Sequence, residues 1–235
     1  RRFDEYSAAG WNRAQRNGTA LSVMLLDSAY IQETDWARAQ LKNHRQRKLA
    51  AAPAPLYTVA QALASLKLLR PVHYGETLRP AESVSVLFHD AGHILGSAWL
   101  EVTVTGEGKP RRLVFSGDLG MPARPVLRDA EKVASEADVL LVESTYGNRL
   151  HRSMSETEDE IVAAVERTHA THGNLIIPAF AVGRTQEIIY LLTDLVRRKR
   201  LSPLKIYVDS PMANTATRIT REHPELLDDE TRELI

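Results

Sequence analysis

The chain has no cysteine, which excludes a disulfide scaffold, a thiolate zinc site and a cysteine nucleophile. Neither charge is in excess, because 30 Lys and Arg residues balance 30 Asp and Glu residues. A basic surface would therefore have to come from local clustering. No apolar run approaches the roughly 18 residues of a membrane span, and the first residues show no signal-peptide pattern. These absences predict a cytoplasmic protein without a membrane segment.

The composition is otherwise that of a folded protein. Of the 235 residues, 43% are apolar and 26% are charged, which excludes disordered, collagen-like and coiled-coil chains. The length fits one large domain or two modest ones with a substantial buried core.

The first third of the chain has a helical pattern. Residues 20–49 contain neither Gly nor Pro and place apolar side chains at helical spacing, which predicts a helix in two pieces. A proline-containing stretch follows and interrupts it. A second helix is predicted over residues 58–70, with Thr58 as its N-cap and Pro71 as its stop.

The apolar period then changes to two. Strands are predicted over residues 83–88, 98–104 and 112–115, the last two joined by a glycine-rich hairpin. Residues 138–142 predict a short strand buried on both faces. After Glu143 the expected order is helix 155–169, strand 174–180, helix 184–200, strand 205–208 and a helix from residue 211. This alternation predicts an α/β fold with a parallel sheet covered by helices.

Three polar side chains each follow the end of a predicted strand. They are His93, Asp118 and Glu143. Loops at one edge of such a sheet converge, so these groups can ligate a metal or transfer protons. Imidazole nitrogen and carboxylate oxygen suit zinc. Ordinary roles stay open for each residue, namely a backbone-bonding turn histidine, an Asx turn at Asp118 and a loop cap at Glu143.

Two helix starts have a composition suited to anions. One is the Gly183-Arg184-Thr185 turn, and the other is Ser210 followed by Pro211. Helix N-termini present unpaired N–H groups, and Arg184 adds a bidentate donor. Ordinary helix capping is the alternative at both places. The basic run at residues 197–200 lies at a helix C-terminus, where we interpret it as a solvated helix end and not as a nucleic-acid patch.

Five motifs together carry a resemblance to a known family. They are AGHILGSA at 91–98, SGDLG at 116–120, VESTYG at 142–147, IPAFAVGRTQE at 177–187 and VDSPMA at 208–213. In this order they resemble the β-CASP family of metallo-β-lactamase-fold nucleases, and above all its prokaryotic RNA-processing exonuclease branch. The resemblance runs from about residue 21 to the C-terminus.

The resemblance implies a role for each matched residue. His93 would ligate one zinc ion and Asp118 would bridge two, with a hydroxide between the metals attacking an RNA phosphodiester. Glu143 would pair with a histidine that acts on the leaving group. Segments contacting RNA would contain Arg184, Thr185, Ser210 and Met212.

The resemblance also implies an incomplete protein. The expected architecture is a partial metallo-β-lactamase αββα domain over residues 1–143 and a partial β-CASP domain over residues 144–235. The His-x-His-x-Asp-His motif should lie upstream of residue 20 but is absent, and two later histidine motifs would lie beyond residue 235. We therefore expect a fragment that is inactive on its own and that could form homo-oligomers only through regions it lacks.

Two other functions remain in competition with this one. The chain could be a catalytically dead β-CASP paralogue that serves as a scaffold for RNA or for a nuclease partner. It could also be a metallo-β-lactamase-fold hydrolase of a small ester, although a β-CASP insertion would make a nucleic-acid cleft instead of a small pocket.

Overall fold

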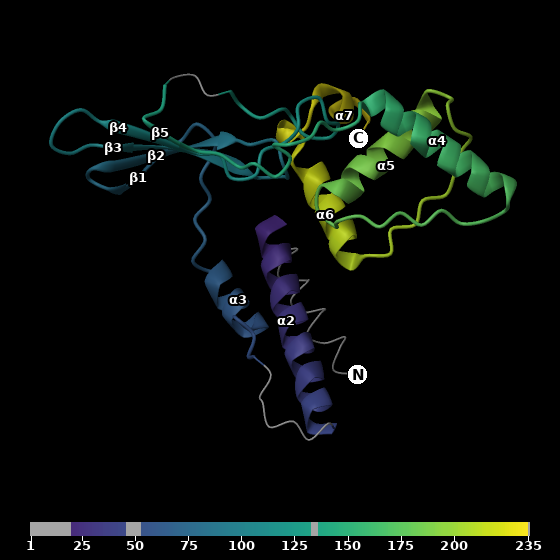
Figure 1. Ribbon diagram of the computed structural model, residues 1–235, viewed down its shortest axis with the longest axis horizontal. Helices are drawn as coiled ribbons and strands as arrows, with labels where there is room; N and C mark the ends of the chain where they lie inside the picture. The colour runs from purple at the N-terminus through teal and green to yellow at the C-terminus, as the bar shows by residue number, and fades with distance from the viewer. Residues whose placement is uncertain (1–19, 46–52, 133–135, 235) are drawn as a thin grey trace. The chain divides into compact units, whose positions relative to one another are not determined.

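The computed structural model describes residues 20–45, 53–132 and 136–234. The chain divides into two compact units, Arg1–Pro71 and Val72–Ile235, with the elements drawn in Figure 1. The predicted domain boundary after residue 143 stays a prediction. The end of the first predicted helix, at 46–49, lies outside the described residues, and so does the segment before residue 20 where the missing histidine motif was expected.

The first unit contains helices α2, Ala20–Arg45, and α3, Val59–Leu66. Over the described residues α2 is one continuous helix, not two pieces. The predicted N-cap at Thr58 is confirmed, since its side chain accepts a hydrogen bond from Gln61 N and the two residues form a capping box. The helix ends at Leu66, before Pro71 can act as its stop. Its buried side chains are Ala62 and Leu66, and those of α2 include Val23, Leu26 and Ala29.

The second unit begins with a five-stranded sheet in the order β1-β2-β3-β4-β5. The strands are β1 Thr77–Ala81, β2 Val84–Asp90, β3 Ala98–Val104, β4 Arg111–Phe115 and β5 Val139–Leu141. The first four are antiparallel neighbours, and β5 runs parallel to β4. Strand β1 was not predicted because Pro80 interrupts its pattern, and it lies at the sheet edge, where proline is tolerated.

The prediction that the fifth strand is buried on both faces is wrong. Val139, Leu140 and Leu141 are 47%, 59% and 48% exposed. Within the described ranges β5 hydrogen-bonds only to β4, so its other edge has no neighbouring strand. An apolar sequence predicts burial, but burial requires elements on both sides of the strand.

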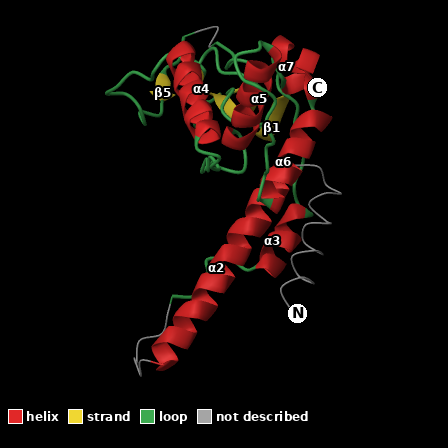
Figure 2. Ribbon diagram, turned by 90° about the vertical axis from the view of Figure 1, so that its right-hand side faces the viewer, coloured by secondary structure: helices red, strands yellow, loops and turns green. Residues whose placement is uncertain are grey.

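Helices follow the sheet, and they are grouped together in Figure 2. They are α4 Met154–Ala170, α5 Arg184–Arg197, α6 Pro211–Glu222, the 3-10 helix η1 Pro224–Leu226 and α7 Asp229–Leu234. Ser153 and Ser210 cap α4 and α6 through their side-chain oxygens. A buried apolar cluster of Val165, Leu192, Leu195 and Leu201 joins α4 to α5 and the turn after α5.

The two strands predicted between these helices do not form. Residues 174–180 and 205–208 belong to no strand of the described chain, and Figure 1 draws them as loops beside α4, α5 and α6. They border an apolar groove of about 740 Å³. Ile176 and Tyr207 are 86% and 83% exposed. The predicted parallel sheet is therefore wrong here, because a ladder needs a paired neighbour that the local pattern cannot supply.

The basic run after α5 is neutralised by acidic side chains. Arg197 bonds Asp194 at 2.7 Å, Arg198 bonds Glu158 at 2.8 Å, and Arg200 bonds Asp159 at 2.6 Å. Arg198 and Arg200 bond carboxylates on α4, so this end of α5 is ion-paired to a neighbouring helix and not only solvated. That the run is not a nucleic-acid patch stays a prediction. Among the described helices, none is long and apolar enough to span a bilayer.

A short segment after β4 connects to the C-terminal helices. Leu127 forms an antiparallel bridge with Leu227, and the N–H of Asp228 donates to Val126 O at 3.2 Å. Val126 is buried and has a φ of 86°, which is rare for a β-branched residue. Such a conformation persists only where the surroundings fix it. Contacts with residues 226–231 therefore hold this segment in place.

Candidate functional site

The turn after β2 carries His93. Asp90 ends the strand, and its Oδ1 accepts the N–H of Gly92 at 2.9 Å. The backbone N–H groups of His93 and Ile94 both donate to Ser97 Oγ, at 3.0 and 3.2 Å. These bonds hold the backbone of the turn, while the imidazole of His93 remains 43% exposed. His93 is thus a turn histidine whose ring is free to contact a ligand.

A close contact between two glycine backbones brings the next loop onto this turn. Gly120 N–H donates to Ala91 O at 2.8 Å. A methyl group on Gly120 would lie 1.9 Å from Gly92 O, so only glycine allows this approach. Asp118 precedes Gly120 by two residues, and its Oδ2 lies 3.9 Å from His93 Nε2. The structure therefore brings together two of the three residues predicted from strand ends.

Glu143 joins the same loop from the end of β5. Its backbone N–H donates to Ser116 Oγ at 3.0 Å, and its Oε1 accepts the N–H of Leu119 at 2.7 Å. The hydrogen bond from the Thr145 side chain, followed by that from Leu119 N, lowers the pKa of the Glu143 carboxyl. Glu143 is therefore ionised at neutral pH, as a carboxylate adjoining the loop that holds Asp118.

The first turn of α5 also approaches the His93 turn. A methyl group on Gly183, whose φ is +82°, would lie 3.2 Å from Ile94 Cγ2. A small cavity of about 30 Å³ is bounded by both segments, with His93 on one side and Gly183 and Gln186 on the other. The start of α5, a predicted anion site, thus lies beside the candidate metal ligands.

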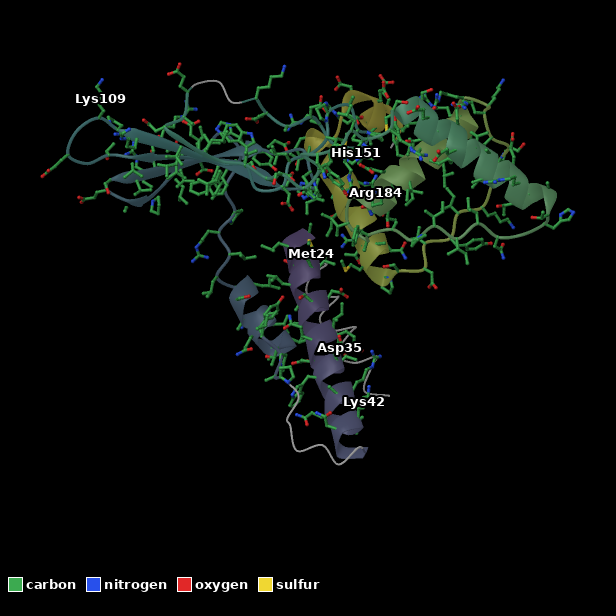
Figure 3. All side chains as sticks on the ribbon, in the orientation of Figure 1. Met24, Asp35, Lys42, Lys109, His151 and Arg184 are labelled. Atoms are coloured by element: carbon green, nitrogen blue, oxygen red, sulfur yellow. The ribbon has the colours of Figure 1, made fainter. Side chains whose placement is uncertain are left out.

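The residues predicted to contact RNA have different local partners. Arg184 lies at the start of α5 (Figure 3), where its exposed guanidinium bonds Glu187 at 2.5 Å. Thr185 Oγ1 donates to Phe180 O at 2.8 Å, and Ser210 Oγ accepts the N–H of Ala213 at 3.1 Å. Met212 is half-buried. Their contact with RNA stays a prediction.

Sequence reasoning missed Gln186, which joins α5 to α6. Its Oε1 accepts the N–H of Gly183 at 2.7 Å. Its Nε2 donates to Thr217 Oγ1 at 2.9 Å, and the residue is 6% exposed. The signal available in the sequence was its place three residues after the helix-initiating glycine, where Gln completes a capping arrangement.

Sequence reasoning also missed the contacts of His89, a half-buried residue near the end of β2. The ring of His89 stacks on Trp99 with centroids 3.8 Å apart, and its Nδ1 lies 2.8 Å from Glu131 Oε2. Trp99 Nε1 donates to Glu131 O at 2.9 Å. Burial raises the pKa of the Asp90 carboxyl in the same place. Glu131 is distant in sequence, so its role was not visible there.

The metal donors that the described residues offer are too few for a closed site. His93 Nε2 and Asp118 Oδ2 are spaced so that one ion about 2 Å from each could contact both. Zinc sites in proteins take three or four protein ligands. Within the described ranges no group of three His, Asp or Glu side chains is placed to hold a metal. These two residues therefore do not fit a complete zinc site by themselves.

Comparison with known proteins finds one domain family and several longer relatives. Residues 185–234 match the Beta-Casp domain family. Ribonuclease TTHA0252 of Thermus thermophilus is 43% identical over 159 residues, or 68% of this chain and 34% of that protein. Transcription termination factor FttA of Methanosarcina mazei is 32% identical over 181 residues, or 76% of this chain and 28% of that protein.

A eukaryotic relative shows the same kind of partial match. Cleavage and polyadenylation specificity factor subunit 3 of Dictyostelium discoideum is 28% identical over 169 residues, which is 72% of this chain and 21% of that protein. The chain therefore spans about a third or less of the length of these curated relatives.

The close approach of the two glycines predicts that Gly120→Ala strongly destabilises the folded protein. The added methyl would overlap the Gly92 carbonyl, and we expect the free energy of unfolding to fall by more than about 2 kcal/mol. Gly106→Ala is the matched control, because nothing lies within 4 Å of its new methyl, and we expect a change within about 0.5 kcal/mol. Urea unfolding of both variants checks this, and equal losses would contradict the proposed contact.

The lowered pKa of Glu143 predicts a pH-dependent effect of Glu143→Gln. The folded-state pKa lies below the ordinary 4.5, so the carboxylate adds stability above pH 4.5 that is lost as pH falls through the folded value. Because the side chain is only half-buried, we expect Gln to reduce stability by less than about 1 kcal/mol at pH 7. The difference between the two proteins should shrink as the pH falls from 4.5 through the lowered folded-state pKa of Glu143. Urea unfolding at pH 3.5, 4.5 and 7 measures it, and a deficit independent of pH would contradict the assignment.

Proposed function

The chain is a relative of the β-CASP family of metallo-β-lactamase-fold RNA nucleases, and from this we propose that it supplies part of a site that hydrolyses RNA phosphodiester bonds. One observation carries the proposal. His93 and Asp118 face each other at 3.9 Å on two loops held together by Gly92 and Gly120, and Glu143 bonds the second of these loops.

His93 and Asp118 are the proposed metal-ligating residues. Their nitrogen and oxygen donors suit zinc, as the family assignment also suggests. Because two donors leave a zinc ion with open positions, we propose that this chain alone binds zinc weakly and cleaves RNA slowly or not at all.

Glu143 is proposed to act as a carboxylate partner and not to give up a proton itself. Its lowered pKa keeps it ionised at neutral pH, when a carboxyl acting as a general acid would have to be protonated. An ionised carboxylate stabilises a neighbouring imidazolium, which can then protonate a leaving group. Glu143 thus supports acid catalysis through a histidine, as the family pattern implies.

The starts of α5 and α6 are proposed to bind RNA phosphates. Both are helix N-termini, where the positive end of the helix dipole favours an anion, although the N–H groups of Arg184, Thr185 and Ala213 already donate within the protein. Gln186 holds the two helices together. Arg184 has an exposed guanidinium at the first of these starts, next to the turn of His93. A phosphate held there would lie close to the candidate hydrolytic residues.

Bound zinc per chain tests the incomplete metal site. After dialysis against buffer with about 1 μM free zinc, elemental analysis should find well under one zinc ion per chain, and less still in the double variant His93→Ala, Asp118→Ala. Labelled RNA incubated with the wild type and zinc should remain intact. Near-stoichiometric zinc that the double variant loses would mean that another chain completes the site. Zinc-dependent cleavage abolished by Asp118→Ala would disprove inactivity of the isolated chain.

Binding of single-stranded RNA tests the proposed phosphate site. Arg184→Ala should raise the dissociation constant about five- to tenfold in low salt and reduce the salt dependence by about one phosphate contact. Arg38→Ala removes the same charge from an exposed position on α2 and should change it less than about twofold. Fluorescence polarisation measures both. Equal effects of the two substitutions would mean that RNA binding depends only on net charge, and this would contradict a phosphate site at Arg184.

A further inference from the structure

The segment at residues 126–131, which we call the strap, runs from the C-terminal helices to the turn of His93. We propose that the strap holds this turn in place and that Thr231, at the far end of the strap, is a positioning residue for His93. The importance of His93 rests on the proposed function, but the coupling between Thr231 and the turn does not.

The far end of the strap is fixed by the segment that includes Thr231. The N–H of Val126 donates to Thr231 Oγ1 at 3.2 Å, and Val126 O accepts the N–H of Asp228 at 3.2 Å. Thr231 is 6% exposed, so water cannot readily replace its hydroxyl. Val126 also has the unfavourable φ of 86°. A strained residue held on both backbone groups relaxes when one of the two bonds is removed.

The near end of the strap contacts the His93 turn through backbone atoms. Glu131 N–H donates to Asp90 O at 2.9 Å, and Arg128 Nη2 lies 3.6 Å from Asp90 Oδ2. Gly92 faces the strap closely, because a methyl group on it would lie 2.7 Å from Ala130 N and 2.8 Å from Arg128 O. No side chain separates the two backbones. A displacement of the strap therefore changes its contact with Gly92, which is one residue before His93.

The strap is also tied to the sheet at Glu131. The Glu131 carbonyl accepts a hydrogen bond from Trp99 Nε1, and the carboxylate bonds His89. Only four residues separate this fixed point from Val126, so little slack is available to absorb a displacement at Val126. Relaxation of Val126 should therefore displace Arg128 and Ala130 relative to Gly92.

Amide hydrogen exchange of the full chain, with neither metal nor RNA, tests the coupling. Thr231→Val keeps the side-chain volume and removes the acceptor, and it should speed exchange of the Gly92 and Glu131 amides at least about fivefold, with amides in the middle of β3 unchanged. Thr231→Ser keeps the hydroxyl and should restore slow exchange. Leu195→Ala is the control for stability, since it opens a buried cluster that does not contact the strap.

Two results would overturn the proposal. In the first, the amides of Val126 and Asp228 exchange faster in Thr231→Val while those of Gly92 and Glu131 keep their wild-type rates. The far end of the strap would then loosen without any change in the turn of His93. In the second, all slow amides of the second unit accelerate together, as expected for Leu195→Ala, so that Thr231 contributes only global stability. Failure of zinc or RNA binding would leave this measurement unaffected, so the two proposals fail independently.

Discussion

The candidate site depends on the contact of two backbones at Gly92 and Gly120. Hydrogen bonds could be formed by many sequences, but a methyl group on Gly120 would lie 1.9 Å from Gly92 O, and one on Gly92 would lie 2.7 Å from Ala130 N. This contact fixes the loop of Asp118 against the turn of His93, and Glu143 is bonded to the same loop. The three polar residues come from separate strands, so their proximity results from this packing and not from any local motif.

Much of the local structure could be predicted from the sequence. Strand β3 has the predicted bounds, and the predicted cap at Thr58 forms, because an alternating pattern and a Thr-x-x-Gln cap are both read within a few residues. Residues 174–180 and 205–208 have the composition of strands and yet form none, and β5 is apolar but exposed. In each of these failures the missing information is the neighbour across the ladder or the layer above it.

The candidate site, too, could be predicted from the sequence only in part. His93, Asp118 and Glu143 could be found because each follows an apolar strand, and the structure brings His93 to Asp118. Gln186 and Glu131 could not be found from such a rule, since their partners lie on other elements, among them Thr217 on α6 and Trp99 on β3. Polar residues that orient others are defined by contacts distant in sequence, whereas candidate ligands are recognisable from their place at strand ends.

Because β5, among the described strands, pairs with a neighbour on one side only, the ionisation of Glu143 also depends on whether this edge of the sheet stays closed. A ladder of three residues with a single neighbour opens more easily than the antiparallel strands beside it. Opening of this edge would release the Leu119 bond, which after the Thr145 side-chain bond contributes to the lowered pKa of Glu143, and protonation would in turn weaken the Leu119 bond. Fraying of the sheet edge and proton uptake by Glu143 are therefore linked equilibria, so acid favours opening of this edge.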